Sequence, residues 1–215
     1  MESAEKRIKE IIRILHQTYP ESRTALTCRN PLQILVSTIL SAQCTDERVN
    51  QITPMLFQKY KSAEEFARAN QGELEEEIRS TGFFRNKAKN IIGASTKVVE
   101  DFSGKVPDNM ADLITLPGVA RKTANIVLSS GYQKSEGIAV DTHVKRLSGR
   151  LGLSSEKNPD KIEQDLLVIV PREDWIDFNY MLVNHGRQVC QARKPRCLEC
   201  PLGHLCPFFQ SSSQS

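Results

Sequence analysis

Residues 116–125 read Leu-Pro-Gly-Val-Ala-Arg-Lys-Thr-Ala-Asn, and the interpretation of the whole chain depends on this stretch. Proline followed by glycine is typical of a tight turn, and the run from Arg121 to Leu128 favours a helix with one apolar face. With a short helix expected at residues 112–116, the unit becomes helix, glycine hairpin, helix. Free amides at the start of the second helix, together with the positive end of its dipole, bind a phosphate without side-chain charge. The stretch therefore predicts a contact with a nucleic-acid backbone that is blind to sequence.

Lys122 lies near the N-terminus of that second helix, where the dipole disfavours a cation. A partly desolvated lysine in such a place is a usable amine nucleophile, and a lysine on a solvated helix face is the plainer alternative. Asp141, in the segment Val-Asp-Thr-His-Val at residues 140–144, precedes an amphipathic run and is expected to cap a helix. Capping alone would explain Asp141, but a carboxylate and an amine in one groove would form an acid/base and nucleophile pair.

The hairpin with its lysine and the Val-Asp-Thr-His segment resemble the helix-hairpin-helix DNA glycosylases, and among these the iron–sulfur proteins of the endonuclease III family. The resemblance extends from about Ile8 to Cys206, which is nearly the whole chain. One departure is Ala120, which stands where the family's hairpin usually has its second glycine. A methyl group is tolerated there only if the residue has a negative φ.

The fold that the resemblance implies is all-α, with two lobes. Residues 22–135 would form a six-helix barrel lobe that contains the hairpin, and residues 1–21 and 136–209 would form an iron–sulfur cluster lobe. Lys122 then belongs to the first lobe and Asp141 to the second, which implies an active site in the cleft between them.

The composition is that of an ordinary globular chain, with 215 residues, 39% hydrophobic and 26% charged. No apolar run is long enough to span a bilayer, and the N-terminus is charged rather than signal-like. A protein of the reducing cytoplasm, without a membrane partner, is therefore expected (nucleoid-associated if prokaryotic).

The net charge of +3 provides no overall field for a polyanion, so DNA binding must depend on local patches and helix ends. Residues 210–215 are all serine or glutamine and are expected to be disordered.

Apolar residues recur at helical spacing along most of the chain, and no segment shows the alternation typical of a strand. Asn30 before Pro31 is expected to cap a helix that is apolar nearly all round. Thr45 or Asp46 is expected to cap the next helix, which Pro54 should break or kink. Further helices are expected at residues 4–18, 74–81, 85–102 and 162–170. Two more are expected to begin at residues 62–65 and at Trp175.

Six cysteines are present, and four of them fall between residues 190 and 206. In a reducing compartment such a cluster indicates a metal before a disulfide. The spacing C-x6-C-x2-C-x5-C contains one close pair, whereas a structural zinc site usually has two, so the spacing favours iron–sulfur over zinc without excluding zinc. The spacing also matches the cluster loop of the resembled family. The resemblance therefore implies that one [4Fe-4S] cluster is bound by Cys190, Cys197, Cys200 and Cys206.

The resemblance implies further contacts with DNA. Gln43, in the Ser-Ala-Gln turn, matches the glutamine that fills the gap left by an extruded base. Phe83 aligns with the residue that enters the base stack, and a core aromatic beside Phe84 is the alternative. The loop at residues 191–196 carries three cations, which contact phosphates if a cluster braces the loop and otherwise form a solvated face. The residues expected to bind DNA are Gln43, Phe83, Leu116, Pro117, Gly118, Val119, Ala120, Arg121, Arg193, Lys194 and Arg196.

The activity that the resemblance implies is that of a bifunctional DNA glycosylase and AP lyase. A monomer would act on double-stranded DNA that contains damaged bases, such as thymine glycol, or abasic sites. The damaged base would leave the stack, Lys122 would attack C1′ to form a Schiff base, and Asp141 would stabilise positive charge on the sugar. The strand would then be cleaved by β-elimination. A glycosylase for mismatched thymine and a non-catalytic hairpin module are the alternatives, although gripping DNA requires neither Lys122 nor Asp141.

Overall fold

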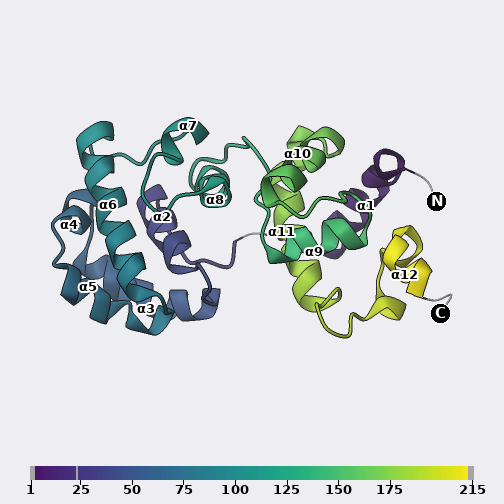
Figure 1. The fold of residues 1–215 in the computed structure, drawn as a ribbon, viewed down its shortest axis with the longest axis horizontal. Coiled ribbons are helices and arrows are strands. Elements are labelled where there is room, and N and C mark those ends of the chain that lie inside the picture. The colour runs from purple at the N-terminus through teal and green to yellow at the C-terminus, as the bar shows by residue number, and fades with distance from the viewer. Residues whose placement is uncertain (1–2, 23, 213–215) are drawn as a thin grey trace. The chain divides into compact units, whose positions relative to one another are not determined.

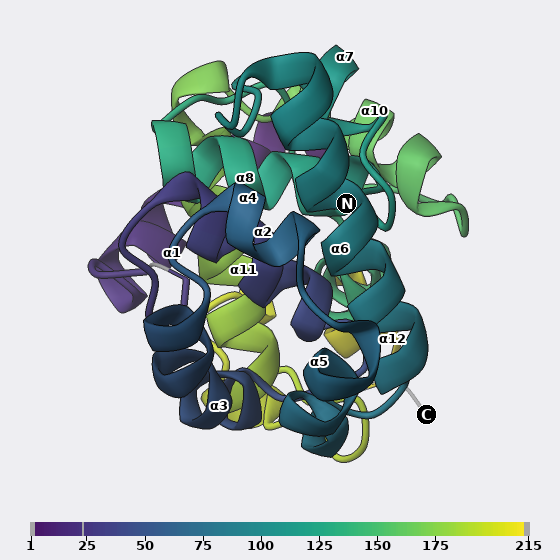
Figure 2. The same ribbon diagram turned by 90° about the vertical axis from the view of Figure 1, so that its left-hand side faces the viewer.

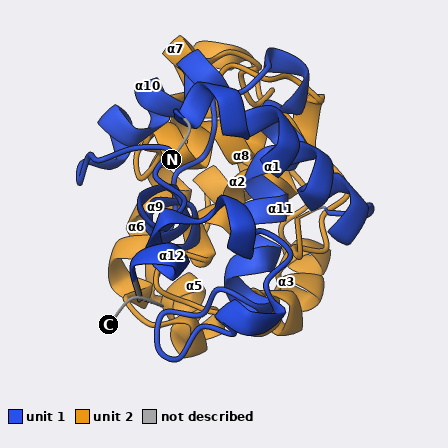
Figure 3. Ribbon diagram, turned by 90° about the vertical axis from the view of Figure 1, so that its right-hand side faces the viewer, with its two compact units in different colours: residues 1–23, 137–215 blue, residues 24–136 orange. Residues whose placement is uncertain are grey.

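The computed structural model describes residues 3–22 and 24–212, and this part of the chain contains helices, turns and loops but no strand (Figure 1). The prediction of an all-α fold is confirmed. The chain divides into two compact units, which are Met1–Arg23 with Gly137–Ser215 (unit 1) and Thr24–Glu136 (unit 2) (Figure 3). Each unit has its own apolar core. Among the described residues, no helix is both long enough and apolar enough to cross a membrane.

Unit 2 is built around α2 (Pro31–Leu40), which Figure 2 shows at the centre of the unit's helices. The Asn30 side chain accepts a hydrogen bond from the amide of Gln33 and so caps the helix, as the sequence predicts. Every residue from Ile34 to Leu40 is buried, because α6 and α8 pack against α2. The other helices of unit 2 are α3 (Asp46–Lys59), α4 (Ala63–Ala67), α5 (Gln71–Glu77), η1 (Arg79–Thr81), α6 (Phe84–Phe102), α7 (Met110–Leu113) and α8 (Arg121–Tyr132).

Helix α3 continues past Pro54, so of the two predicted effects of the proline, a break or a kink, the break is wrong. Proline removes one backbone N–H from the hydrogen-bond ladder of a helix. However, Val49, Thr53 and Leu56 are buried along one face of α3 on both sides of the proline. Burial of that shared face stabilises the helix through Pro54 to its end.

Unit 1 packs α1 (Ala4–Thr18) against α10 (Pro159–Ile169) and α11 (Trp175–Gln188). The buried residues of α1 recur at the helical spacing that the sequence predicts. The buried Arg7 donates hydrogen bonds from Nη1 to the carbonyl oxygens of Leu151 (2.8 Å) and Leu205 (2.7 Å). It thereby joins α1 to segments far away in sequence. The remaining elements are α9 (Thr142–Arg150), η2 (Arg172–Asp174), η3 (Cys197–Glu199), η4 (Gly203–Leu205) and α12 (Pro207–Ser212).

Helix α12 corrects the expectation of a disordered tail from residue 210. Residues 210–212 are helical, and residues 213–215 lie outside the described part of the chain. Phe209 packs against the core of unit 1, and the Gln210 side chain donates a hydrogen bond to the carbonyl oxygen of His204 (2.9 Å). Because Phe209 anchors this segment, its polar composition does not prevent it from forming a helix.

Candidate functional site

The hairpin connects α7 to α8 and is held to the core of unit 2 by two apolar side chains. Leu116 and Val119 are buried, at 2% and 6% exposure. Pro117, Gly118 and Ala120, which alternate with them, are exposed. The backbone of the hairpin is therefore presented to solvent on a fixed apolar base.

Gly118 and Ala120 have different backbone requirements. Gly118 has a φ of +75°, and a Cβ atom there would lie 2.7 Å from Nδ2 of Asn90, so glycine is required for both reasons. Ala120 has a φ of −93°, which any residue adopts. The methyl group at position 120 is therefore compatible with the hairpin, as its negative φ was expected to allow.

Helix α8 begins without a side-chain cap, because its N-cap residue is Ala120. The first amides of a helix have no acceptor within the helix, so this end offers donors and a positive dipole end to an anion. Lys122, in the first turn, is exposed. The partial desolvation expected for this amine is therefore not provided by neighbouring side chains, because the hairpin places the helix start on the surface.

Asp141 caps α9, as the sequence predicts. Its Oδ1 accepts hydrogen bonds from the amides of His143 and Val144, both at 2.8 Å. In the described part of the chain, Oδ2 accepts no hydrogen bond. The side chain is half-buried. Asp141 is thus a carboxylate whose orientation is set by the helix through one oxygen, while the other oxygen is available.

A cavity of about 200 Å³ in unit 2 brings together three of the predicted DNA-binding residues, Gln43, Phe83 and Gly118. Gln43 and Phe83 both have left-handed backbone conformations, with φ of 53° and 47°. Phe83 is 62% exposed, whereas its neighbour Phe84 packs against the core. The alternative of Phe83 as a core aromatic is therefore wrong.

Four cysteines from the C-terminal part of unit 1 line a second, small cavity, together with apolar residues such as Phe209. Burial, with a smaller contribution from the nearby sulfurs of the other three cysteines, raises the pKa of the Cys200 thiol to about 11. Among the described residues, no three side chains converge closely enough to hold a single metal ion. Four thiols around one cavity provide the ligand set that a [4Fe-4S] cluster requires. The cavity is lined by Cys190, Cys197, Cys200 and Cys206.

The cysteine loop is braced by two arginines of α9. Arg146 donates hydrogen bonds to the carbonyl oxygen of Cys190 from Nε (3.2 Å) and Nη2 (3.0 Å). Arg150 donates to the carbonyl oxygens of Gln191 (2.7 Å) and Ala192 (3.0 Å). The C-terminal half of the helix that Asp141 caps therefore holds the start of the cysteine loop.

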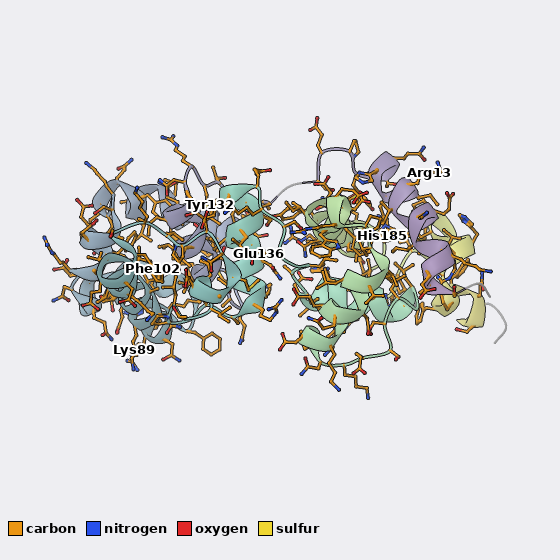
Figure 4. The ribbon with its side chains drawn as sticks, turned by 90° about the horizontal axis from the view of Figure 1, so that it is seen from above. Arg13, Lys89, Phe102, Tyr132, Glu136 and His185 are labelled. Atoms are coloured by element: carbon orange, nitrogen blue, oxygen red, sulfur yellow. The ribbon has the colours of Figure 1, made fainter. Side chains whose placement is uncertain are left out.

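A buried histidine also contacts the cluster site. His185, inside unit 1 (Figure 4), is 1% exposed, and burial lowers its pKa to about 4. Its Nδ1 lies 3.0 Å from the Tyr19 hydroxyl, and its Nε2 lies 3.4 Å from the Cys200 sulfur. A neutral imidazole that accepts from the tyrosine can donate to the sulfur.

The three cations of the loop are all exposed, but they are not equivalent. Arg196 donates a hydrogen bond to the carbonyl oxygen of Gln188 and forms an ion pair with Glu199 at 3.3 Å. Lys194 has a left-handed φ of 53°, and it and Arg193 extend from the surface. Arg196 therefore has a structural role in the loop besides its charge.

The chain matches known proteins over almost its whole length. Residues 36–172 match the model of the HhH-GPD superfamily of base excision DNA repair proteins, and residues 190–206 match the iron-sulfur binding domain of endonuclease III. Endonuclease III of Synechocystis sp. is 55% identical over 212 residues, which is 99% of this chain and 97% of that protein. The chain belongs to the endonuclease III family.

Solved structures agree with this assignment. An endonuclease III trapped as a covalent intermediate with DNA superposes with a TM-score of 0.93 at 37% identity, over 99% of this chain and 100% of that one. A thermostable thymine-DNA glycosylase gives a TM-score of 0.88 at 25% identity, over 98% and 100%. As a member of the endonuclease III family, the chain is an enzyme of base excision repair, a DNA glycosylase with AP lyase activity, and it carries a [4Fe-4S] cluster.

The sequence did not single out Lys87, a residue of unit 2. It is 3% exposed and lines the cavity beside Gln43 and Phe83. Its position carried a signal, because Lys87 precedes the buried Ile91 and Ala94 at helical spacing and so falls on the apolar face of α6.

Proposed function

We propose that this enzyme removes oxidised pyrimidines, such as thymine glycol, from duplex DNA and cleaves the strand through a Schiff base on Lys122. The observation that carries the proposal is the position of Lys122, an exposed amine in the first turn of a helix whose N-terminus has no side-chain cap. A phosphate bound by the amides of α8 would hold the sugar-phosphate backbone beside that amine. A similar endonuclease III has been trapped as a covalent intermediate with DNA, which supports a nucleophilic mechanism.

Lys122 would act as the nucleophile at C1′ of the damaged nucleotide. DNA over the hairpin would exclude water from the exposed side chain and make its amine a better nucleophile. Attack at C1′ breaks the bond to the base, which leaves with the bonding electrons and takes up a proton. Opening of the sugar ring then gives the imine. Loss of a proton from C2′ and expulsion of the 3′ phosphate complete the β-elimination.

Asp141 would stabilise positive charge that develops on the same sugar. The two hydrogen bonds to Oδ1 fix the orientation of the carboxylate, so Oδ2 would need no rearrangement during the reaction. Fixed charge of this kind is effective because its ordering has already occurred in the folded protein.

Gln43 and Phe83 would occupy the space opened when the damaged base leaves the stack. Both are exposed on turns that flank one cavity, and both turns belong to the same unit as the hairpin. Base extrusion costs a few kcal/mol, which side chains that fill the gap would partly offset. The hairpin residues expected to contact the backbone are Leu116, Pro117, Gly118, Val119, Ala120 and Arg121.

Unit 2 would be the six-helix barrel lobe, and unit 1 the cluster lobe. Cys190, Cys197, Cys200 and Cys206 would bind the four irons, and the cluster would supply structural stability to their loop rather than chemistry. Arg193 and Lys194 would contact phosphates from this braced loop, with Arg196 adding its charge. We place the enzyme in the cytoplasm as a monomer that acts on damaged double-stranded DNA.

Borohydride trapping on a panel of duplexes tests the substrate. Borohydride delivers hydride to the imine and converts the Schiff base to a stable amine. The native protein should be trapped on thymine-glycol DNA and on abasic-site DNA, and only weakly on G·T or A·8-oxoguanine duplexes. Preferential processing of G·T would instead favour the mismatched-thymine alternative, which the similarity to a thymine-DNA glycosylase supports. Binding without cleavage or trapping on any duplex would favour a non-catalytic module.

A further inference from the structure

Lys87 combines a buried ammonium with two backbone acceptors from different elements. Its Nζ donates hydrogen bonds to the carbonyl oxygens of Leu40 and Thr81, both at 2.8 Å. Leu40 is the last residue of α2, and Thr81 is the last residue of η1. An ammonium has three donors, so a single lysine can satisfy two carbonyls at once.

The two carbonyls mark the starts of the two turns that carry Gln43 and Phe83. Gln43 follows Leu40 by three residues, and Phe83 follows Thr81 by two. The backbone amide of Lys87 also donates to the carbonyl oxygen of Phe83 at 3.1 Å. Lys87 therefore contacts one turn through its side chain alone and the other through both side chain and backbone.

Both turns contain a backbone conformation that needs external support. Gln43 and Phe83 have positive φ values, which are uncommon for residues other than glycine and persist only where the surrounding structure holds them. Both side chains are exposed, so their own burial does not provide that support. The hydrogen bonds of Lys87 are placed to provide it, because they fix the ends of the helical segments from which the turns start.

The charge of Lys87 also suits its surroundings. Its two acceptors are carbonyls at the C-terminal ends of helical segments, where the dipole is negative and favours a cation. Burial lowers the pKa of Lys87, since the ammonium has lost water. An apolar side chain at this position would keep the packing but would leave both carbonyls without their donor.

We propose that Lys87 is a positioning residue of the enzyme, which fixes the two turns so that Gln43 and Phe83 fill the space of the extruded base together. This inference rests on the proposed function, in which those two side chains enter the base stack. Lys87 itself contacts neither the reacting sugar nor the base.

The variant Lys87→Met tests the proposal, because it keeps the length and apolar stem of the side chain and removes the donors. Its matched control is Lys89→Met on the same helix, since Lys89 is exposed and points away from the unit (Figure 4). The duplex carries thymine glycol with 2-aminopurine beside it, whose fluorescence rises when the bases unstack. Lys87→Met should lose most of the fluorescence rise, and its single-turnover rate should fall by about 10²-fold, the effect of misplacing a group by about 1 Å. Lys89→Met should retain both.

Two further variants separate positioning from a loss of fold. In a Gln43→Ala, Phe83→Ala background, Lys87→Met should cause no further loss of the fluorescence rise, because the groups it positions are gone. If Lys87→Met does not retain its helical circular dichroism, Lys87→Gln replaces it, and a smaller loss of the same sign is expected because two N–H donors remain.

The outcomes distinguish this inference from the proposed function. Native fluorescence and rate in a folded Lys87 variant would overturn the inference, and so would an equal loss in Lys89→Met. If the native protein produced neither unstacking nor cleavage of the thymine-glycol duplex, the proposed function would fail first.

Discussion

Helices α8 and α9 begin in opposite ways. Ala120 precedes α8 and has no side-chain oxygen, so the first amides of that helix have no side-chain cap. Asp141 precedes α9 and binds two of its first amides through Oδ1. The N-terminus of α8 is therefore open, because its first amides can bind an anion from outside the protein. The N-terminus of α9 is closed, because its first amides already bind the carboxylate of Asp141.

This difference gives the N-termini of α8 and α9 different roles in the proposed reaction. An uncapped helix start can bind a DNA phosphate, and the exposed Lys122 next to it can then reach the sugar. A capped helix start repels phosphate, but it holds a carboxylate in a fixed orientation, where the carboxylate can stabilise a cation. In the proposed reaction the nucleophile, Lys122, thus comes from the open N-terminus of α8. The group that stabilises charge, Asp141, comes from the closed N-terminus of α9.

Removing the amine of Lys122 from the open N-terminus of α8 should have the largest effect on activity. Lys122→Gln should abolish borohydride trapping and strand cleavage, because an amide forms no Schiff base, while DNA binding through the backbone amides should change little. Trapping on a gel and a binding titration measure the two effects. Lys105→Gln is the matched control, since it removes an exposed lysine from the same unit. Trapping that survives Lys122→Gln would place the nucleophile elsewhere.

Removing the charge of Asp141 at the closed N-terminus of α9 should have the next largest effect on activity. Asparagine caps a helix about as well as aspartate, so Asp141→Asn should keep the fold and the DNA affinity. Its single-turnover rate should nevertheless fall by at least ~10²-fold, the scale of losing a preorganised charge. Asp141→Ala should lose a similar rate and, in addition, about 1 kcal/mol of stability because the cap is gone. A native rate in Asp141→Asn would reduce Asp141 to its capping role.

The other end of α9 permits a test of the cluster loop, which Arg146 and Arg150 bind. The native protein should contain iron and sulfide and little zinc. Cys197→Ser should disorder the loop, because much of the folding free energy of such a loop is ligation free energy. If Arg193 and Lys194 then lose their phosphates, the salt dependence of DNA binding should become shallower by about 2 in slope. Cys28→Ser, outside the loop, is the control, and an iron-free protein with full activity would contradict a structural cluster.

Adding a side-chain cap to the open N-terminus of α8 should have the smallest effect on the enzyme. Ala120→Asp would cap α8 and place a negative charge where a phosphate is expected to bind. DNA affinity should fall by about 5-fold, the scale of a charge at a helix end, while the melting temperature rises because a cap contributes about 1 kcal/mol. Ala120→Gly, the residue usual in the family, should leave affinity unchanged. An unchanged affinity in Ala120→Asp would mean that the phosphate is bound elsewhere.

Local signals predicted the parts of the fold that depend on neighbouring residues. The caps at Asn30 and Asp141 were predictable because a side-chain oxygen and the amides that it binds lie within three residues. The gathering of four cysteines around one cavity was predictable, since all four come from one short segment. For Ala120 the sequence provided only a condition, a negative φ, and the structure supplies the sign of that angle.

Features that depend on distant parts of the chain were not predictable in the same way. The acceptors of Lys87 are 47 and 6 residues away, so no local pattern identifies them. The continuity of α3 through Pro54 depends on the core that buries its face, and the order of α12 depends on where Phe209 packs.

Mass-spectrometric mapping of the trapped complex tests the nucleophile most directly. The native protein is reduced with borohydride on thymine-glycol DNA, the DNA is digested to a sugar remnant, and the peptides are sequenced. The remnant should be found on Lys122, with cleavage by trypsin blocked after that residue. A remnant on any other lysine, or on the N-terminal amine, would contradict the assignment of Lys122 as the nucleophile.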